Sequence, residues 1–551
     1  MSKFQMSGKI FLMAVAAVFS LAAVSCASVG YPEGGEVDRT PPKSLTSSPD
    51  NGTTNFSSAE IKIIFDEYVQ LKNVSDNVLI SPPFAQKPEI TANGKNVQIK
   101  IKDTLRENTT YLFQFKDAVA DVNEGNLLPS FDYVFSTGDA HDSLVADGRV
   151  VDALSLKPEE NIYVYLYDDF SDSAVAKMNP AYLTKTDKNG YFKLKYLADR
   201  KYKILALSDS DKSGTYNNST EKLGFLFDTI TPLPDDTSRA PMCKMIRTFV
   251  QKTDVQRVAS SNMTEKGKAK ITTILPMVNP KITSLSGDVV TYLNASSDTL
   301  LVWAKQPSDS LTIWLKDTTG INDTIKLRIF KTKRGTTPLV STNAKGSLPY
   351  FDTVRFAFAN PVDSVVADSC LVFIKSDADS LCLPIVFEDD TRLKAHLDFK
   401  LKPETTYKIT LPKNSIFDIY GTTNDTLQFT AKTTSPADYG TIKITLVPVA
   451  ETNFYIVQLL MDNDKIVAEK TMDASSQTAV VFNNLKAGKY TVRVIADANK
   501  NRKWDFGSYW EHLQPETVYY LPKVLELRSS WDMEELLDLN DSDSQQVRAA
   551  K

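Results

Sequence analysis

Alternating acidic and amide side chains follow an apolar run near the C-terminus, in IADANKNRKWDFG at residues 495–507. Four of them carry the oxygen atoms that calcium prefers as ligands, and these are Asp497, Asn499, Asn501 and Asp505. They match positions 1, 3, 5 and 9 of an EF-type loop, which also needs a glycine at position 6 and a bidentate glutamate at position 12. Arg502 and Ser508 stand at those two positions. The stretch therefore has only part of the pattern of a calcium loop.

A second polar stretch of the same kind occurs 288 residues earlier, in LSDSDKSGTYN. Its oxygen-bearing candidates are Asp209, Asp211, Ser213 and Asn217. Gly214 stands at position 6 here, but position 12 is Thr220, so the expected bidentate carboxylate is again missing. Asp and Asn side chains also bond their own backbone in tight turns. Each loop is therefore either a weak calcium site or a backbone-capping turn, and the sequence leaves both open.

Aromatic side chains crowd the same C-terminal region, where Trp504, Tyr509 and Trp510 lie close together in the sequence. Exposed aromatic rings can form a platform for a sugar ligand, and this loop is where we would expect one. Aromatic residues are also ordinary strand formers, so packing in a core or at its rim is the favoured interpretation.

Catalytic motifs are not found in this sequence. The three histidines, His141, His396 and His512, occur neither in HExxH nor beside a nucleophile motif. Adjacent acids such as Asp66 and Glu67 point to opposite faces of a strand and do not form a catalytic pair. The sequence therefore predicts a protein that is not an enzyme and needs no cofactor, apart from a weakly bound calcium ion.

Length and charge narrow the class of protein further. The 551 residues are enough for about four to five domains, at roughly 100 to 150 residues each. The 63 basic and 68 acidic side chains are well mixed and give a formal net charge of -5, so no basic surface is expected to attract nucleic acid.

The first residues predict export. Lys3 and Lys9 precede the uncharged run IFLMAVAAVFSLAAV, which is shorter than the roughly 20 residues needed to cross a bilayer. AAVSC then ends at Cys26 and resembles the lipobox of bacterial lipoproteins. That resemblance implies cleavage before Cys26 and acylation of its thiol, with fatty acids such as palmitate holding the protein on a membrane.

Short alternating runs such as EIKIIF, NIYVYLY, TYKITL and YTVRVIA, bounded by turn residues, dominate the remaining chain. This pattern is typical of antiparallel β-sandwiches, so we predict an all-β protein. The C-terminal WDMEELLDL is the main candidate for a helix. Cys243, Cys370 and Cys382 are expected to be buried thiols, because a hairpin centred near Asp377 does not set the last two opposite each other.

Internal repeats indicate how these strands are grouped. LADRKYKILALSDSDKSGTYN aligns without gaps on LKAGKYTVRVIADANKNRKWD, and NTTYLFQF in the first half corresponds to ETTYKITL in the second. TPPKSLTSSPDNGTTNFSSAEIKIIFDEYV with LRENTTYLFQFKDAVADVNEGN and YVFSTGD resembles the SbsA-type bacterial Ig-like domain. TDKNGYFKLKYLADRKYKILAL resembles the prealbumin-like, carboxypeptidase-regulatory type of sandwich.

The resemblances imply a tandem array of about five β-sandwich domains, Ig-like and prealbumin-like, after an N-terminal signal. The expected segments are a lipoprotein signal at 1–25, a flexible stalk at 26–40, an Ig-like domain at 41–138, a prealbumin-like sandwich at 143–236, a further sandwich at 240–336, a second Ig-like domain at 337–434, a second prealbumin-like sandwich at 439–537, and a frayed tail at 538–551.

Such arrays hold binding surfaces away from a membrane. The expected function is therefore that of a non-enzymatic structural or adhesion-type binding module, anchored by lipid to the bacterial cell envelope and most simply to its outer membrane. A glycan or another envelope protein is the expected partner. The alternatives are a calcium-stabilised carbohydrate-binding protein or adhesin, and an accessory protein of a hydrolase.

Overall fold

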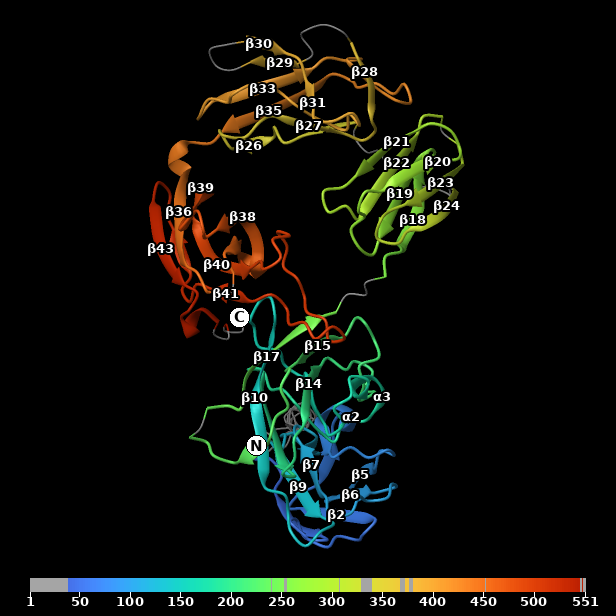
Figure 1. The fold of residues 1–551 in the computed structure, drawn as a ribbon, viewed down its shortest axis with the longest axis vertical. Coiled ribbons are helices and arrows are strands. Elements are labelled where there is room, and N and C mark those ends of the chain that lie inside the picture. Colours follow the sequence, from blue (N-terminus) through green and yellow to red (C-terminus); the bar gives the residue numbers. More distant parts are fainter. Residues whose placement is uncertain are drawn as a thin grey trace, which may run out of the picture. The chain divides into compact units, whose positions relative to one another are not determined.

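The computed structural model describes residues 38–238, 240–251, 255–306, 308–328, 339–366, 372–375, 380–450, 452–545 and 548. The expected signal, Cys26 and most of the expected stalk lie outside these residues. Almost every element in the described part is a strand, and the helices are single short turns (Figure 1). The prediction of an all-β fold built from antiparallel sandwiches is confirmed. The chain forms two compact units. The first ends at Leu144 and also includes Tyr196–Ala198, and the second holds the other described residues.

The first unit is an Ig-like sandwich. Its strands are β1 (Ser44–Ser48), β2 (Glu60–Phe65), β3 (Val69–Leu71), β4 (Val78–Ser81), β5 (Glu89–Asn93), β6 (Asn96–Lys100), β7 (Thr110–Phe115), β8 (Val119–Asp121) and β9 (Phe131–Ser136), with one short helix, α2 (Val74–Asn77). They pair as β1-β2-β6-β5, β4-β7-β9 and β3-β8. Ile61, Ile63 and Phe65 alternate inward along β2 and are fully buried, as its period of two predicts.

The first sandwich of the second unit carries the loop at Asp209. Its strands are β10 (Leu144–Asp152), β11 (Tyr163–Tyr167), β12 (Tyr182–Lys185), β13 (Tyr191–Leu197), β14 (Lys203–Leu207), β15 (Lys222–Phe225), β16 (Leu233–Pro234) and β17 (Cys243–Val250), with a helical turn α3 (Ala174–Lys177). They form one sheet in the order β12-β11-β14-β15-β17-β10-β13, with β16 paired to β10. The boundary predicted at residue 240 therefore lies too early, because β17 completes this sheet by pairing with β10 and β15.

Two further sandwiches follow. The first has β18 (Val258–Glu265), β19 (Lys268–Thr273), β20 (Lys281–Ser284), β21 (Val289–Leu293), β22 (Thr299–Ala304), β23 (Ser310–Lys316) and β24 (Asn322–Arg328). The second has β25 (Val340–Thr342), β26 (Gly346–Leu348), β27 (Arg355–Phe358), β28 (Val362–Val365), β29 (Val372–Lys375), β30 (Ser380–Leu383), β31 (Val386–Phe387), β32 (Lys394–His396), β33 (Thr406–Leu411), β34 (Ile416–Asp418) and β35 (Leu427–Thr433).

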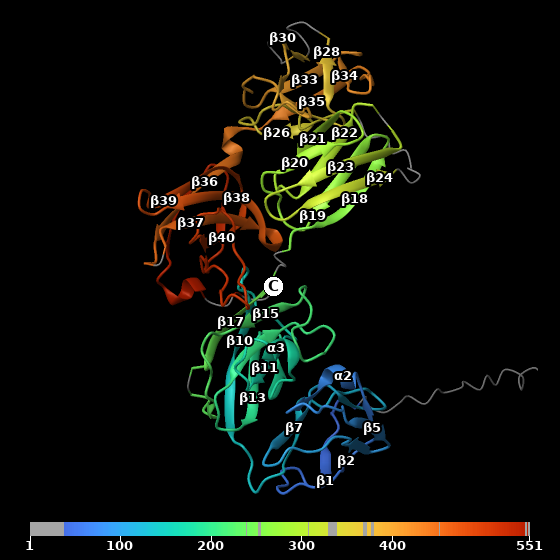
Figure 2. The same ribbon diagram turned by 45° about the vertical axis from the view of Figure 1, so that its right-hand side comes forward.

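The last sandwich, drawn in orange to red in Figure 2, carries the loop at Asp497. After a short turn, η1 (Pro436–Asp438), its elements are β36 (Tyr439–Val447), β37 (Phe454–Met461), η2 (Asp462–Asp464), β38 (Lys465–Asp473), β39 (Ala479–Lys486), β40 (Gly488–Ala496), β41 (Val518–Tyr520), β42 (Leu525–Leu527), β43 (Asp532–Asp538) and η3 (Ser542–Gln545). They pair as β39-β36-β43 and β38-β37-β40-β41, with β42 also on β40.

Two expectations about the C-terminus are wrong. The candidate helix WDMEELLDL is strand β43, which pairs in parallel with β36 just as β17 pairs in parallel with β10. The predicted frayed tail is packed in its described part, where Leu539 and Ser544 are both buried. In both cases partners distant in the sequence override the local pattern, and local sequence does not reveal such partners.

One cysteine also differs from the prediction. Cys382 forms a disulfide, whereas Cys243 is a buried free thiol. The hairpin register places Phe373 opposite Cys382, and Cys370 lies outside the described residues. Pairing across the hairpin therefore could not identify the bond.

Candidate functional site

The loop after β14 is organised around the buried carboxylate of Asp209. Its Oδ1 accepts a hydrogen bond from Ser213 N at 3.0 Å, and its Oδ2 accepts from Gly214 N at 2.8 Å and from the Tyr165 hydroxyl at 2.7 Å. Asp211 Oδ1 also accepts from Ser213 N, at 3.0 Å. The first Asp therefore fixes the turn by binding amides four and five residues ahead, which is Asx-type capping.

A glutamate missed in the sequence closes this loop. Leu207 on β14 pairs with Leu223 on the antiparallel strand β15. Asp209, two residues after Leu207, therefore lies opposite Glu221, two residues before Leu223. Glu221 Oε1 accepts from Ser210 N at 3.2 Å. Carboxylate oxygens of Asp209, Asp211 and Glu221 all lie within 4.8 Å of one another. Among the described residues, this is the one group of three or more Asp, Glu, His or Cys side chains close enough together to hold a metal ion. Hairpin register was the signal that could have found Glu221, because residues opposite each other share a face.

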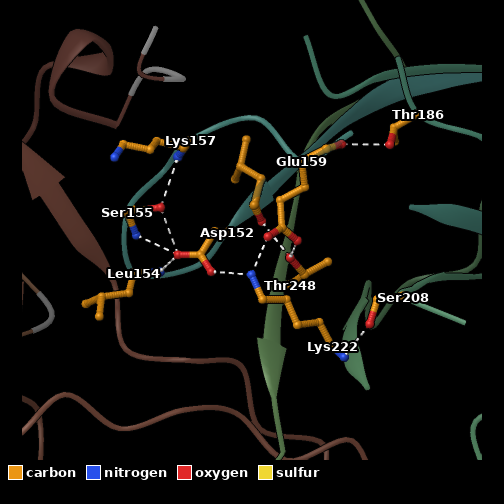
Figure 3. Close-up of polar contacts among 10 residues, drawn as sticks. Asp152, Leu154, Ser155, Lys157, Glu159, Thr186, Ser208, Lys222 and Thr248 are labelled. Atoms are coloured by element: carbon orange, nitrogen blue, oxygen red, sulfur yellow. Dashed lines mark hydrogen bonds and ion pairs between the residues drawn. The ribbon is translucent and has the colours of Figure 1, made fainter. Parts of the chain in front are cut away.

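The base of the loop is held shut by paired hydrogen bonds. Ser208 N donates to Lys222 O at 2.9 Å, and Lys222 N donates to Ser208 Oγ at 2.7 Å. Figure 3 shows the Lys222 side chain reaching toward Asp152 and Glu159. Its Nζ lies 2.9 Å from Asp152 Oδ2 and also pairs with Glu159, which in turn accepts from Thr248. Lys222 is therefore engaged by two carboxylates of this network.

The loop after β40 has the same backbone and the same capping. Asp497 is fully buried, and its two oxygens accept from Asn501 N at 3.1 Å and Arg502 N at 2.8 Å. Positive φ angles recur at matching positions, 58° at Lys212 and 63° at Lys500, and 75° at Gly214 and 62° at Arg502. Both loops therefore share one conformation, in which Arg502 adopts the left-handed geometry that glycine adopts at the matching position.

Glu516 closes the second loop in the position of Glu221. Ile495 pairs with Val518, which sets Asp497 opposite Glu516, and Ala498 N donates to Glu516 Oε1 at 3.0 Å. Here the other oxygen, Oε2, also has a partner, because Asp505 N donates to it at 3.1 Å. Asn499 and Asn501 both donate through their side-chain amides to Asp505 Oδ2. The predicted ligand groups of this loop therefore hydrogen-bond to one another and to the backbone.

Burial of the closing glutamates changes their acidity. Burial raises the pKa of Glu516 from 4.5 to about 7, against the lowering effect of the amides of Asp505 and Ala498. Burial also raises the pKa of Glu221, and the charges of Asp209 and Asp211 add to that increase. Hydrogen bonds from Asn217 and within the loop lower the pKa of Asp211 to about 2.

The aromatic residues of the predicted ligand platform have different environments. Trp504 Nε1 donates to Glu516 O at 3.1 Å, and its ring packs against a buried cluster. Tyr509 is only 3% exposed, and its ring packs edge-on against Phe225. Trp510 is 46% exposed and lies near Tyr216, with ring centroids 6.4 Å apart. Of the three, only Trp510 offers an open face.

The two sandwiches that carry these loops are joined by a shared apolar cluster, here called the module interface. Val151 and Leu156 come from the first sandwich, and the second contributes Ile456, Leu460, Ile495, Val518 and Tyr520. The Tyr520 hydroxyl donates to Leu154 O at 3.0 Å. Asp464 pairs with both Lys157 and Arg548, and these cations lower its pKa although its burial opposes them.

A further polar cluster in this region contains His512. Its Nε2 lies 3.0 Å from Asp172 Oδ2, and Lys203 Nζ lies 3.1 Å from both Asp172 Oδ1 and the Tyr509 hydroxyl. The cluster links residues of the two sandwiches. Its partially exposed ion pairs are a structural tie rather than an activated nucleophile and base.

Comparisons with known proteins identify two segments of the chain. Residues 38–137 match the family of bacterial Ig-like domains. Residues 433–510 match a family described as an uncharacterized protein conserved in bacteria (DUF2141). Neither match spans half of the chain, and no curated protein matches the sequence. None of the helices in the described part has the length and apolar character to cross a membrane.

Several solved β-rich structures resemble parts of the chain. BcpA, the major pilin subunit of Bacillus cereus, has 11% identity and a TM-score of 0.14, over 72% of this chain and 98% of the pilin. Domains 1–6 of the surface layer protein SbsC have 13% identity and a TM-score of 0.13, over 94% of this chain and 70% of the SbsC chain. SGBP-B of the Bacteroides ovatus mixed-linkage glucan utilization locus, in complex with a heptasaccharide, has 11% identity and a TM-score of 0.18, over 62% of this chain and 88% of the SGBP-B chain. At these scores no ligand or activity is transferred, and the family match supports the prediction of an Ig-like β-sandwich near the N-terminus.

Proposed function

We propose that the chain is a non-enzymatic, lipid-anchored protein of the bacterial cell envelope whose β-sandwiches form a structural or binding module. Acylation at Cys26, on the outer membrane in the simplest case, would provide the anchor. The lipobox-like AAVSC and the apolar run before it support this part of the proposal.

The module interface is the observation that carries the proposal. Five side chains of the last sandwich and two of an earlier one, at least 300 residues away in sequence, form a cluster in which none is more than 3% exposed. A buried interface of this kind makes a stable unit out of separate sandwiches, which suits a spacer or a binding scaffold. His141 belongs to the first unit and His396 lies on β32, and neither occurs in a catalytic motif of the sequence, which supports a non-enzymatic role.

A glycan is the first partner to test, because of one specific observation. Trp510 is half exposed beside Tyr216, and such a surface pair can stack on the apolar face of a sugar ring. A calcium-stabilised carbohydrate-binding protein or adhesin is therefore the second candidate. An envelope protein as partner, and a role as a hydrolase accessory, remain alternatives that the same experiments address.

Metabolic labelling with an alkyne fatty acid tests the anchor. We expect the wild-type chain to be labelled and to stay with membranes through an alkaline wash, and Cys26→Ser to lose both properties. A Cys243→Ser variant is the matched control, because that thiol is buried and free. Membrane retention of unlabelled Cys26→Ser would contradict the lipid anchor.

A glycan array tests the partner. The wild type should bind a subset of glycans, and Trp510→Ala should weaken this binding by about tenfold or more, while Trp531→Ala should not. Trp531 is a suitable control because it is 50% exposed on the same sandwich. Equal binding by wild type and Trp510→Ala would exclude this surface as the platform.

A further inference from the structure

We propose that the loop of residues 209–221 binds one calcium ion through the carboxylates of Asp209, Asp211 and Glu221. Ligand oxygens from these three side chains lie within 4.8 Å of one another. Calcium favours such sets of carboxylate oxygens, completed by neutral oxygens and water. The inference is independent of the proposed function, because the site belongs to one sandwich whatever the whole chain binds.

Glu221 provides an observation that the acidic cluster alone does not. Its side chain is only 2% exposed, and its Oε2 is buried without any hydrogen-bond partner. Among the described residues this is the one carboxylate oxygen in that condition. An ionised carboxylate buried without a partner is costly, and it is more so beside two other acids. A bound cation would satisfy the oxygen and neutralise the cluster at once.

The loop is already shaped for a ligand. Asp209 is held by two backbone amides and the Tyr165 hydroxyl, and Gly214 at position 6 has a φ of 75°. The bonds between Ser208 and Lys222 close the base of the loop. Because the carboxylates are positioned before binding, less ordering is required when the ion enters.

The positive charge nearest in sequence to Glu221 does not replace the ion. Lys222 directs its ammonium group to Asp152 and Glu159 (Figure 3). Its charge is therefore engaged by that network, and Glu221 Oε2 keeps no hydrogen-bond partner.

The loop at Asp497 supplies an internal control. Its closing glutamate, Glu516, has both oxygens paired with backbone amides at 3.0 and 3.1 Å. No buried carboxylate oxygen without a partner is found there among the described residues. Replacing each glutamate by glutamine thus removes one charge from equivalent positions, but only the change at Glu221 should affect the ion.

Isothermal titration calorimetry of the full chain, purified in detergent and freed of metal, tests the proposal with calcium chloride as the probe. We expect one ion per chain with a dissociation constant of about 0.1 to 1 mM, the range of extracellular calcium modules. Glu221→Gln should weaken binding by more than about tenfold, and the exposed Asp211→Asn should also weaken it. Glu516→Gln should bind like the wild type.

Folding is checked by near-ultraviolet circular dichroism and thermal melting without calcium. Glu221→Gln should melt at or above the wild-type temperature, because it removes a buried charge, so loss of calcium binding would not reflect misfolding. Absence of binding by the wild type up to about 10 mM calcium would overturn the proposal. It would also be overturned if Glu516→Gln lost the ion while Glu221→Gln kept it.

Discussion

The two Asp loops share a backbone and differ in what their side chains leave unsatisfied. Asp209 and Asp497 cap equivalent amides, and each faces a glutamate across a hairpin. Glu221 keeps a buried oxygen without a partner, whereas Asp505 N donates to the corresponding oxygen of Glu516. The comparison shows that a repeat can preserve the shape of a loop while changing its capacity for a cation.

Removing the capping Asp should have the largest effect on both loops. Asp497→Ala leaves the amides of Asn501 and Arg502 without their acceptors, and we expect a loss of about 3 kcal/mol in local stability, because each is a charge-assisted bond. Asp209→Ala should lose a similar amount in calcium-free buffer. Hydrogen exchange of the two loops by mass spectrometry measures this, with unchanged exchange in the first unit as control. If only one of the two substitutions reduced the stability of its own loop, the two caps would not be equivalent.

The next effect distinguishes the loops by pH. Glu516 has its pKa raised from 4.5 to about 7 by burial, with the charges of Asp505 and Asp497 adding to the shift. The folded state therefore binds this proton more tightly than the unfolded state, so the contribution of Glu516 to stability is fully present below about pH 4.5 and is lost as the pH rises through about 7.

Thermal melts in chelator at pH 5 and pH 8 check this sign. The wild type should lose more stability than Glu516→Gln over this interval, since the amide has no proton to lose. Identical pH dependence of the two proteins would show that Glu516 is ionised throughout. Calcium should leave the Glu516 effect unchanged.

The smallest predicted effect concerns position 6 of each loop. Arg502 and Gly214 have φ angles of 62° and 75°, a region that costs a side-chain residue roughly 1 kcal/mol. Arg502→Gly should therefore stabilise its loop by up to about 1 kcal/mol, and Gly214→Ala should destabilise its loop by a similar amount. A Cβ at Gly214 would meet its nearest neighbours at 3.5 Å, so backbone strain rather than a clash is tested. Thermal melting in calcium-free buffer measures both changes in stability. A change of the same sign in the two variants would contradict the shared conformation.

Sequence patterns predicted much of the fold for physical reasons. Alternation in EIKIIF places Ile61, Ile63 and Phe65 on one face, and those residues form a core. The helix predicted for WDMEELLDL was wrong because this segment forms strand β43 by pairing with β36, which lies about 90 residues earlier in the chain. Tyr509 was placed in the predicted platform, but it is buried against Phe225 from another sandwich.

The sequence by itself determined the all-β class, the repeat, and the two Asp residues that begin equivalent loops. These features rest on local periodicity and on residue spacing within short segments. Only the tertiary structure decided which carboxylate closes each loop, because hairpin pairing sets Glu221 and Glu516 opposite those Asp residues from 12 and 19 positions away. It also decided that a single oxygen, Glu221 Oε2, stays buried without a partner, and this depends on three-dimensional packing rather than on local sequence.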